Sequence, residues 1–275
     1  MNQETFDNLG EAGAGRGIWE RDGVIRGLSR GGYPWRSCWQ GDFDLCGYRR
    51  PQSYFREAVW RGGCEPRIFT THPEHYGESY SGTGWHWYDV SDSWTFPKEY
   101  IGKPVRAEVY TDAEEVEFLL NGKTIGRAEA QKGVAALSIP YEKGKLTART
   151  YRKHVFCGES SLCTAGPASS VAVIPEKQEI MSDNRDLCYF DISILDEKGI
   201  RVPGEKQELT AVADGGELLC IFSGDPANED AYTSGSCHAW DGRAVAVVRA
   251  SAPGKVRLIV EAKGLRTGTA VVTAR

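Results

Sequence analysis

The chain has 275 residues, of which 40% are hydrophobic and 26% charged, and its net charge is −5. At about 150 residues per domain, this length predicts about two globular domains, and the composition excludes a largely disordered chain. The acidic balance offers no basic surface for nucleic acid, and no stretch approaches the ~20 apolar residues of a membrane helix. A complete TIM barrel takes about 250 residues, so the chain is too short for such a barrel beside other domains.

The first 63 residues read mainly as loop. They begin MNQETFDNLGEAG, without the basic and apolar regions of a secretory signal, so we expect a cytoplasmic protein. One segment, residues 53–60, has apolar residues at helical spacing, with Ser53 as a candidate N-cap and Gly62-Gly63 as a stop. We therefore expect one short helix here, in a segment that cannot build a core alone.

Residues 101–166 have the pattern of β-strands. The Asn121-Gly122 pair lies between two apolar runs, which is the strongest short-range signal for a β-hairpin. The expected strands cover residues 105–110, 116–120, 123–126, 134–139 and 145–151. We expect an immunoglobulin-like sandwich over residues 64–166 that draws one or two strands from residues 64–100, followed by a linker at 164–168.

A second series of short strands occupies residues 167–275. The expected strands are 170–174, 187–195, 207–212, 218–222, 244–250, 256–262 and 269–273. Seven short strands in about a hundred residues predict a second immunoglobulin-like sandwich. The fold class that we expect is therefore mainly β.

The chain has eight cysteines but no C-x-x-C pair for zinc binding or redox chemistry. We interpret them as mostly free thiols in a reducing compartment. Cys64, Cys157 and Cys163 are the candidates for a pair.

Two groups of polar residues invite a functional interpretation. Asp42 and Asp44 either hold backbone N–H groups in a loop or contact a substrate. His72, His75 and Glu78 have a spacing of three, whereas zinc-binding helices place histidines four apart, so we expect a packed or surface loop and no metal site. The sequence contains no P-loop and no G-x-S-x-G motif, and we expect no cofactor.

Tryptophan is concentrated in the first third of the chain, where seven of the eight Trp lie at or before residue 94. In extended backbone, Trp85 and Trp87 point to the same side. Such aromatic faces pack in cores and between domains, or they stack on the C–H faces of sugars. Both interpretations remain open at this stage.

Several segments resemble one known family. The first group is FDNLGE at residues 6–11, YPW at 33–35, GDFDLCG at 41–47 and RPQSY at 50–54. This group resembles the end of the catalytic barrel of glycoside hydrolase family 2 β-galactosidases. Asn8 stands where that family usually has Tyr, and the usual Trp before the Asp is missing. VEFLLNGK at 116–123 with Gly126, TAGPA at 164–168 and GDP at 224–226 resemble the family's later β-sandwich domains.

The resemblance implies that this chain lacks the catalytic pair. In the family, the acid/base Glu and the nucleophile Glu lie on earlier barrel strands, so neither has a counterpart here. Glu11 corresponds to a Glu that follows the last barrel strand, and we assign no catalytic residue. The candidate substrate contacts are Asp7, Glu11, Trp35, Asp42, Trp85 and Trp87.

The implied architecture is the closing edge of a (β/α)8 barrel over residues 1–63, followed by immunoglobulin-like sandwiches over 64–166 and 167–275. We expect a carboxyl-terminal, non-catalytic portion of an enzyme that hydrolyses terminal β-galactosides with retention. Its sandwiches would brace the barrel and shape the substrate site. The family also includes β-glucuronidases and β-mannosidases.

The expected partners are a β-galactoside or related glycan, bound through the parent enzyme, and the missing barrel as a domain or a separate subunit. We expect neither nucleic acid nor a membrane as a partner. The alternative is a freestanding carbohydrate-binding or scaffold module, for which the Trp cluster is the distinguishing feature.

Overall fold

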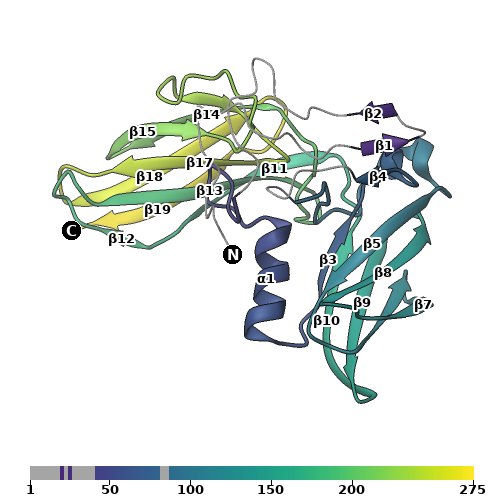
Figure 1. Ribbon diagram of the computed structural model, residues 1–275. Coiled ribbons are helices and arrows are strands. Elements are labelled where there is room, and N and C mark those ends of the chain that lie inside the picture. Colours follow the sequence, from purple (N-terminus) through teal and green to yellow (C-terminus); the bar gives the residue numbers. More distant parts are fainter. Residues whose placement is uncertain (1–18, 22–23, 27–40, 81–86) are drawn as a thin grey trace. The chain divides into compact units, whose positions relative to one another are not determined.

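The computed structural model describes residues 19–21, 24–26, 41–80 and 87–275. The chain forms two compact units, Met1–Thr164 and Ala165–Arg275, and the boundary falls at the start of the 164–168 segment. Strands dominate both units, which confirms the mainly β fold class (Figure 1). No helix within these described ranges is long and apolar enough to cross a membrane.

The first unit is built around two packed sheets. Its elements are β1 (Trp19–Arg21), β2 (Val24–Arg26), α1 (Pro51–Arg61), β3 (Arg67–Thr70), the 3₁₀ helices η1 (Pro73–His75) and η2 (Lys98–Tyr100), β4 (Ser79–Tyr80), β5 (Pro104–Tyr110), β6 (Glu115–Leu120), β7 (Lys123–Glu129), β8 (Val134–Pro140), β9 (Lys145–Arg152) and β10 (Val155–Cys163). One sheet has the order β3-β5-β8 and the other β10-β9-β6-β7, while β2-β1-β4 form a small separate sheet. As expected, the sandwich draws a strand, β3, from residues 64–100.

The core of this sandwich lies between the two larger sheets. Alternate residues of β5, including Val105 and Val109, meet Val116 and Phe118 of β6, and all four are fully buried. Trp94 is also fully buried in this core, and its indole nitrogen donates to the Glu142 carbonyl at 2.9 Å. Burial of these side chains gives the first unit its main hydrophobic stabilisation.

The β6–β7 hairpin confirms the turn prediction at Asn121-Gly122. Both residues have positive φ, 53° and 82°, as a type I′ turn requires. The Asn121 side-chain oxygen also accepts the Lys145 N–H at 2.9 Å, which ties the turn to β9.

Helix α1 differs from its prediction at the amino-terminal end. It begins at Pro51 with Arg50 as N-cap, because proline at the first helical position has its φ already set. Ser53 lies inside the first turn, where its hydroxyl donates to the Arg50 carbonyl at 2.8 Å. The expected stop at Gly62 is confirmed, since Gly62 is the C-cap with φ 67°.

Strand β10 was missed by the sequence prediction. It pairs with β9 through a tight connection in which Lys153 and His154 both have positive φ, 50° and 64°. Neither residue is a typical turn glycine, so the hairpin has no strong local signal. The register shifts between Phe156 and Gly158, which places Cys157 in a β-bulge.

The second unit is a sandwich of a four-stranded and a five-stranded sheet. Its strands are β11 (Ala168–Pro175), β12 (Glu179–Ile180), β13 (Leu187–Asp196), β14 (Glu208–Asp214), β15 (Glu217–Phe222), β16 (Ser236–His238), β17 (Arg243–Arg249), β18 (Gly254–Ala262) and β19 (Gly268–Ala274). The sheet orders are β11-β13-β17-β15 and β12-β19-β18-β14-β16. All seven expected strands are present, and the short β12 and β16 are additional. Inward residues of both sheets, such as Phe190, Ile192 and Leu258, form one core.

Candidate functional site

Two of the six candidate substrate contacts fall in the described part of the chain, and both belong to the first unit. Asp42 lies in the loop before α1, and Trp87 lies in the segment between β4 and η2. Asp7, Glu11, Trp35 and Trp85 lie outside the described residues.

The loop before α1 is organised by its two aspartates. Asp44 accepts the backbone N–H groups of Cys46 and Tyr48, each at 2.9 Å, so it has the backbone-holding role that its spacing predicts. Asp42 is buried, and its carboxylate forms an ion pair with Arg56 of α1. A buried carboxylate paired in this way anchors the loop to the helix.

Helix α1 is held against the first unit by its apolar face. Phe55 lies 5.0 Å from Trp87 and 5.7 Å from Tyr110, measured between ring centroids. The Val59 side chain approaches the turn before β8, where a Cβ on Gly133 would lie only 3.1 Å from it. The helix therefore packs directly on the sandwich.

The exposed face of α1 carries charges. Arg49 binds Glu57 at 2.7 Å and lies 3.9 Å from the centre of the Tyr54 ring. The hydrogen bond from Arg49 is the main cause that lowers the pKa of Glu57. This carboxylate is therefore held in its ionised form.

Trp87 belongs to an aromatic cluster beneath α1. Its ring stacks on Tyr88 at 5.1 Å, and its indole nitrogen donates to the Tyr110 hydroxyl at 3.0 Å. Phe69 and Val90 complete the buried part of this cluster. These contacts correspond to the packing interpretation of Trp87, whereas a role in sugar contact stays a prediction.

Glu108 is the polar centre of this cluster, and sequence reasoning missed it. It is only 3% exposed, and its carboxylate accepts the Tyr88 hydroxyl at 2.6 Å and the Arg106 Nε at 2.7 Å. The Tyr88 and Tyr110 hydroxyls lie 3.2 Å apart. The alternation of β5 indicates that Arg106, Glu108 and Tyr110 share one face, but nothing local indicates that this face is covered.

Burial shifts the acid–base behaviour of the two tyrosines. It raises the pKa of Tyr88 far above its ordinary value, and the neighbouring Tyr110 and Glu108 add to the shift. Burial likewise raises the pKa of Tyr110. Both phenols therefore stay neutral and act as hydrogen-bond donors to Glu108, which suits a structural network.

A small pocket of about 150 Å³ lies beside α1. Its lining residues are Tyr54, Glu57, Ala58, Arg61, Gly62, Gly63, Glu65, Arg67 and Tyr110. Pockets that enclose drug-sized ligands usually measure about 300–1,000 Å³, so this pocket is smaller than that range.

A larger pocket of about 350 Å³ is lined by Glu114, Glu115, Glu129, Ala130, Tyr151 and His154. Two of its carboxylates are engaged, since Glu115 pairs with Arg127 at 2.6 Å and Glu114 accepts the Lys153 N–H at 2.8 Å.

The histidine segment forms local pairs. His75 contacts Glu78 at 2.8 Å and Glu74 at 3.2 Å, while the His72 ring packs edge-on against Phe96. Within the described residues, no group of three His, Cys, Asp or Glu side chains has metal-binding geometry.

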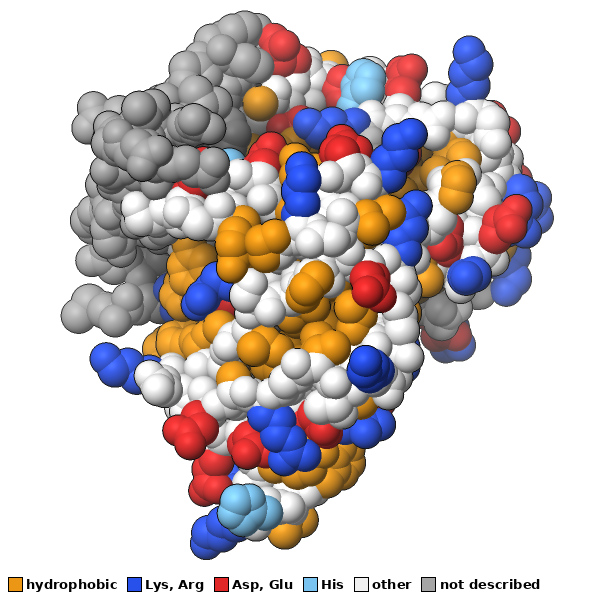
Figure 2. Space-filling model, turned by 90° about the vertical axis from the view of Figure 1, so that its right-hand side faces the viewer, with side chains coloured by type: hydrophobic (Ala, Val, Ile, Leu, Met, Phe, Trp, Pro, Cys, Tyr) orange, Lys and Arg blue, Asp and Glu red, His pale blue; other side chains and the backbone are white. Residues whose placement is uncertain are grey.

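Charges of both signs are interspersed over the face shown in Figure 2, with hydrophobic side chains between them. Cross-strand ion pairs also occur in the first unit. Arg127 of β7 reaches Glu115 and Glu117 of β6, and Arg149 of β9 lies 2.6 Å from Glu159 of β10. Solvent screens the exposed pairs, so they contribute little to stability, whereas Glu117 is buried.

Comparison with known families matches two segments of the chain. Residues 171–271 match the model described as glycoside hydrolase family 2 C-terminal domain 5. Residues 102–155 match a domain of unknown function, DUF4982. Each match lies within one of the two structural units.

Individual relatives extend the similarity to almost the whole chain. "Beta-galactosidase BoGH2A" of Bacteroides ovatus is 25% identical over 269 residues, which are 95% of this chain and 28% of the relative. A protein of Formosa agariphila named "Putative beta-glucuronidase" is 24% identical over 274 residues, which are 98% of this chain and 22% of the relative. The crystal structure of a family 2 member from Bacteroides cellulosilyticus is 29% identical with a TM-score of 0.86, and the match covers 98% of this chain and 35% of that one.

The fold, the matched segments and the relatives agree in supporting a carboxyl-terminal part of a glycoside hydrolase family 2 protein. The chain spans about a quarter of the length of the curated relatives that it matches.

Proposed function

We propose that this chain serves as the non-catalytic, carboxyl-terminal part of a family 2 glycosidase, in which its sandwiches brace the catalytic barrel and shape the substrate site. The observation that carries the proposal is the docking of α1. This helix lies in the segment that resembles the end of the barrel, and Phe55 packs it onto Trp87 and Tyr110 of the first unit. A helix held in this way fixes the position of the preceding barrel-end segment relative to the sandwich.

The connection after α1 supports the same role. The backbone N–H of Asp112 donates to the Gly63 carbonyl at 3.1 Å, and the Thr111 and Thr150 hydroxyls both donate to the Cys64 carbonyl. Residues 63–64 are therefore bound to strand β9 and to the connection between β5 and β6. We infer that the barrel edge and the first sandwich move as one body in the parent enzyme.

The proposed parent reaction is retaining hydrolysis of terminal β-galactosides. The barrel-end motifs and the name of the Bacteroides ovatus relative support it. The name of the Formosa agariphila relative supports β-glucuronides as a second candidate. Retaining glycosidases place two carboxyl groups about 5–5.5 Å apart across the scissile bond, and we propose that the barrel supplies both.

A first experiment tests whether the chain lacks catalysis. The purified chain is incubated with 4-nitrophenyl β-galactoside and with 4-nitrophenyl β-glucuronide. We expect release of nitrophenol no faster than in buffer. Turnover by the chain alone, abolished by heat denaturation, would refute the proposal that it is non-catalytic.

A chimera tests the bracing role and the substrate class. The matched segment of the Bacteroides ovatus relative is replaced by this chain, and a truncated relative without that segment is the control. We expect the chimera to hydrolyse β-galactoside faster than the truncated enzyme does. Equal rates in the two proteins would contradict bracing, and a preference of the chimera for β-glucuronide would move the assignment to that class.

The freestanding carbohydrate-binding module remains the alternative. Trp87 is partly buried, and its contacts with Tyr88 and Tyr110 weigh against its use as an exposed stacking platform. Calorimetric titration of the chain with galactosides and plant oligosaccharides distinguishes the two. Binding that is lost in Trp85→Ala would favour the module.

A further inference from the structure

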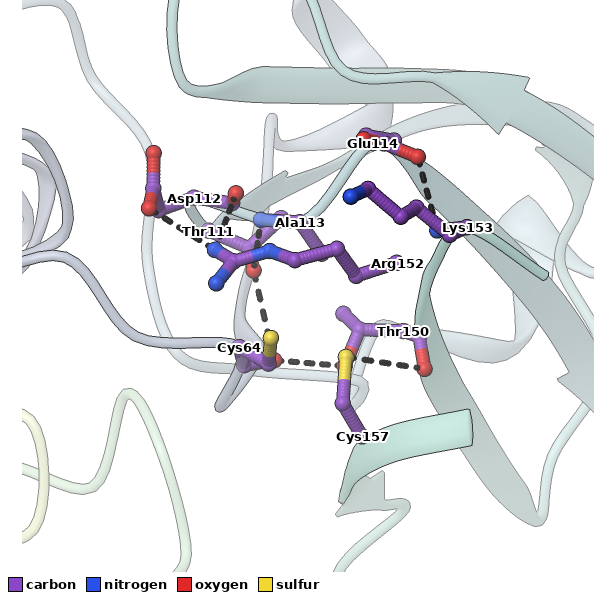
Figure 3. Close-up of polar contacts among 9 residues, drawn as sticks. All are labelled: Cys64, Thr111, Asp112, Ala113, Glu114, Thr150, Arg152, Lys153 and Cys157. Carbon is purple, nitrogen blue, oxygen red and sulfur yellow. Dashed lines mark hydrogen bonds and ion pairs between the residues drawn. The ribbon is translucent and has the colours of Figure 1, made fainter. Parts of the chain in front are cut away.

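Two cysteines that are far apart in sequence meet beside α1. Cys64 lies in the connection between α1 and β3, and Cys157 lies on β10. Both are free thiols, Cys157 exposed and Cys64 partly buried. Figure 3 shows the two cysteine side chains on either side of Thr150. Burial, and then the neighbouring Cys157 thiol, raise the pKa of Cys64.

The backbone around the two cysteines is arranged so that they stay close. The Thr150 hydroxyl donates to the Cys64 carbonyl at 2.5 Å, while the Cys157 sulfur lies 3.5 Å from the Thr150 carbonyl and 3.8 Å from its hydroxyl. Thr150 therefore contacts both cysteines at once.

Gly158 and the bulge explain how β10 comes so near. A Cβ on Gly158 would lie 2.9 Å from the Cys64 carbonyl oxygen and 3.1 Å from the Pro66 ring, so only glycine allows this approach. Cys157 is the extra residue of the bulge, and a bulge turns the side chain of that residue away from its regular direction. The bulge thus presents the Cys157 thiol to Cys64.

We propose that Cys64 and Cys157 form a reversible disulfide when the protein meets a low-molecular-weight disulfide oxidant. The bond would join β10 covalently to the connection that follows α1. It closes a loop of about 90 residues, and cross-links that close long loops restrict the unfolded chain most strongly. This inference does not depend on the proposed function.

The reaction is a two-step thiol–disulfide exchange. The exposed Cys157 thiol loses its proton to solvent, and the thiolate attacks one sulfur of oxidised glutathione, releasing one glutathione thiolate. The Cys64 thiol then loses its proton, and its thiolate attacks the Cys157 sulfur, releasing the second glutathione. Two protein thiols are oxidised and one glutathione disulfide is reduced to two thiols. Burial raises the pKa of Cys64, so the second step is slow at neutral pH.

Peptide mapping of the full chain tests the proposal. The chain is treated with oxidised glutathione, free thiols are alkylated, and the digest is analysed by mass spectrometry. We expect a linked peptide containing Cys64 and Cys157, two hydrogens lighter than the sum of the reduced peptides and lost on treatment with dithiothreitol. We also expect the oxidised chain to melt several degrees higher than the reduced chain.

Variants identify the pair. Cys157→Ser and Cys64→Ser should each abolish the linked peptide and the shift in melting temperature, whereas Cys163→Ser, on the same strand as Cys157, should retain both. A glutathione adduct on Cys157 with Cys64 still alkylated would overturn the proposal, as would a bond from either residue to Cys163. The wild-type map decides the question even if one variant fails to fold.

Discussion

The hydrogen bond from Tyr88 to Glu108, beneath α1, can be removed by a substitution that changes little else. Tyr88→Phe deletes a single hydroxyl that donates to a buried carboxylate at 2.6 Å and leaves the ring in place. A hydrogen bond to a charged group contributes about 1.5–3 kcal/mol, because the carboxylate loses a partner it cannot replace with water. For a unit of this size, that corresponds to a fall in Tm of about 3–12 °C.

Urea unfolding followed by Trp fluorescence measures this effect, since seven of the eight Trp belong to the first unit. The matched control is Tyr76→Phe, which removes an exposed hydroxyl bonded to Ser138 at 2.8 Å and should cost less than about 0.5 kcal/mol. In a Glu108→Gln background, Tyr88→Phe should cost only the ~0.5–1.5 kcal/mol of a neutral hydrogen bond.

Two results would refute this reasoning. One is a cost of Tyr88→Phe no larger than that of Tyr76→Phe. The other is an unchanged cost in the Glu108→Gln background, because the double-mutant cycle would then assign no coupling to the charge.

Three further predictions follow from burial and close packing. The pKa of Tyr88 is raised in the folded state, so the neutral phenol contributes fully to stability below its ordinary pKa near 10, and this contribution is lost as pH rises above that value. The urea midpoint should therefore fall between pH 9 and 11, and it should fall less steeply in Tyr88→Phe. Equal slopes in the two proteins would contradict the pKa shift. Gly158→Ala should lower the free energy of unfolding of the first unit by about 1–3 kcal/mol, because the added Cβ would collide with Cys64 and Thr150. The control Gly166→Ala, whose Cβ would stay 3.4 Å from Asp196, should leave urea unfolding almost unchanged. Burial raises the pKa of the Cys237 thiol to about 12. Iodoacetamide at pH 8.5 should therefore label the exposed Cys157 and spare Cys237 until the chain unfolds. Similar labelling rates for the two cysteines in the native protein would contradict the burial of Cys237.

Local signals were sufficient for most strands. The alternation of residues 105–110 and the Asn121-Gly122 turn correctly predicted β5 and the β6–β7 hairpin, because a turn and a half-buried strand depend on residues close in sequence. The same reasoning missed β10, whose connection uses Lys153 and His154 at positive φ. It also placed the N-cap of α1 at Ser53, although proline at residue 51 carried the better signal.

The candidate site was less accessible to sequence reasoning. Asp44 was predicted in its backbone-holding role, since an aspartate in a tight loop bonds N–H groups two to four residues on. Glu108 was missed, because a charged residue in an alternating strand ordinarily indicates a solvent-exposed face. Its burial depends on Tyr88, which reaches it from twenty residues away in sequence.

The sequence by itself determined the mainly β character, the resemblance to glycoside hydrolase family 2, and the positions of most strands, because these follow from periodicity, turn chemistry and short motifs. Only the tertiary structure decided which faces are covered and which distant residues meet. Residues 107–110 of β5 are buried on both faces of the strand, because α1 and residues 87–90 cover the second face. Cys64 meets Cys157 because a bulge and Gly158 bring β10 against the connection after α1. Such contacts join segments that share no local pattern, so they arise only when the chain packs.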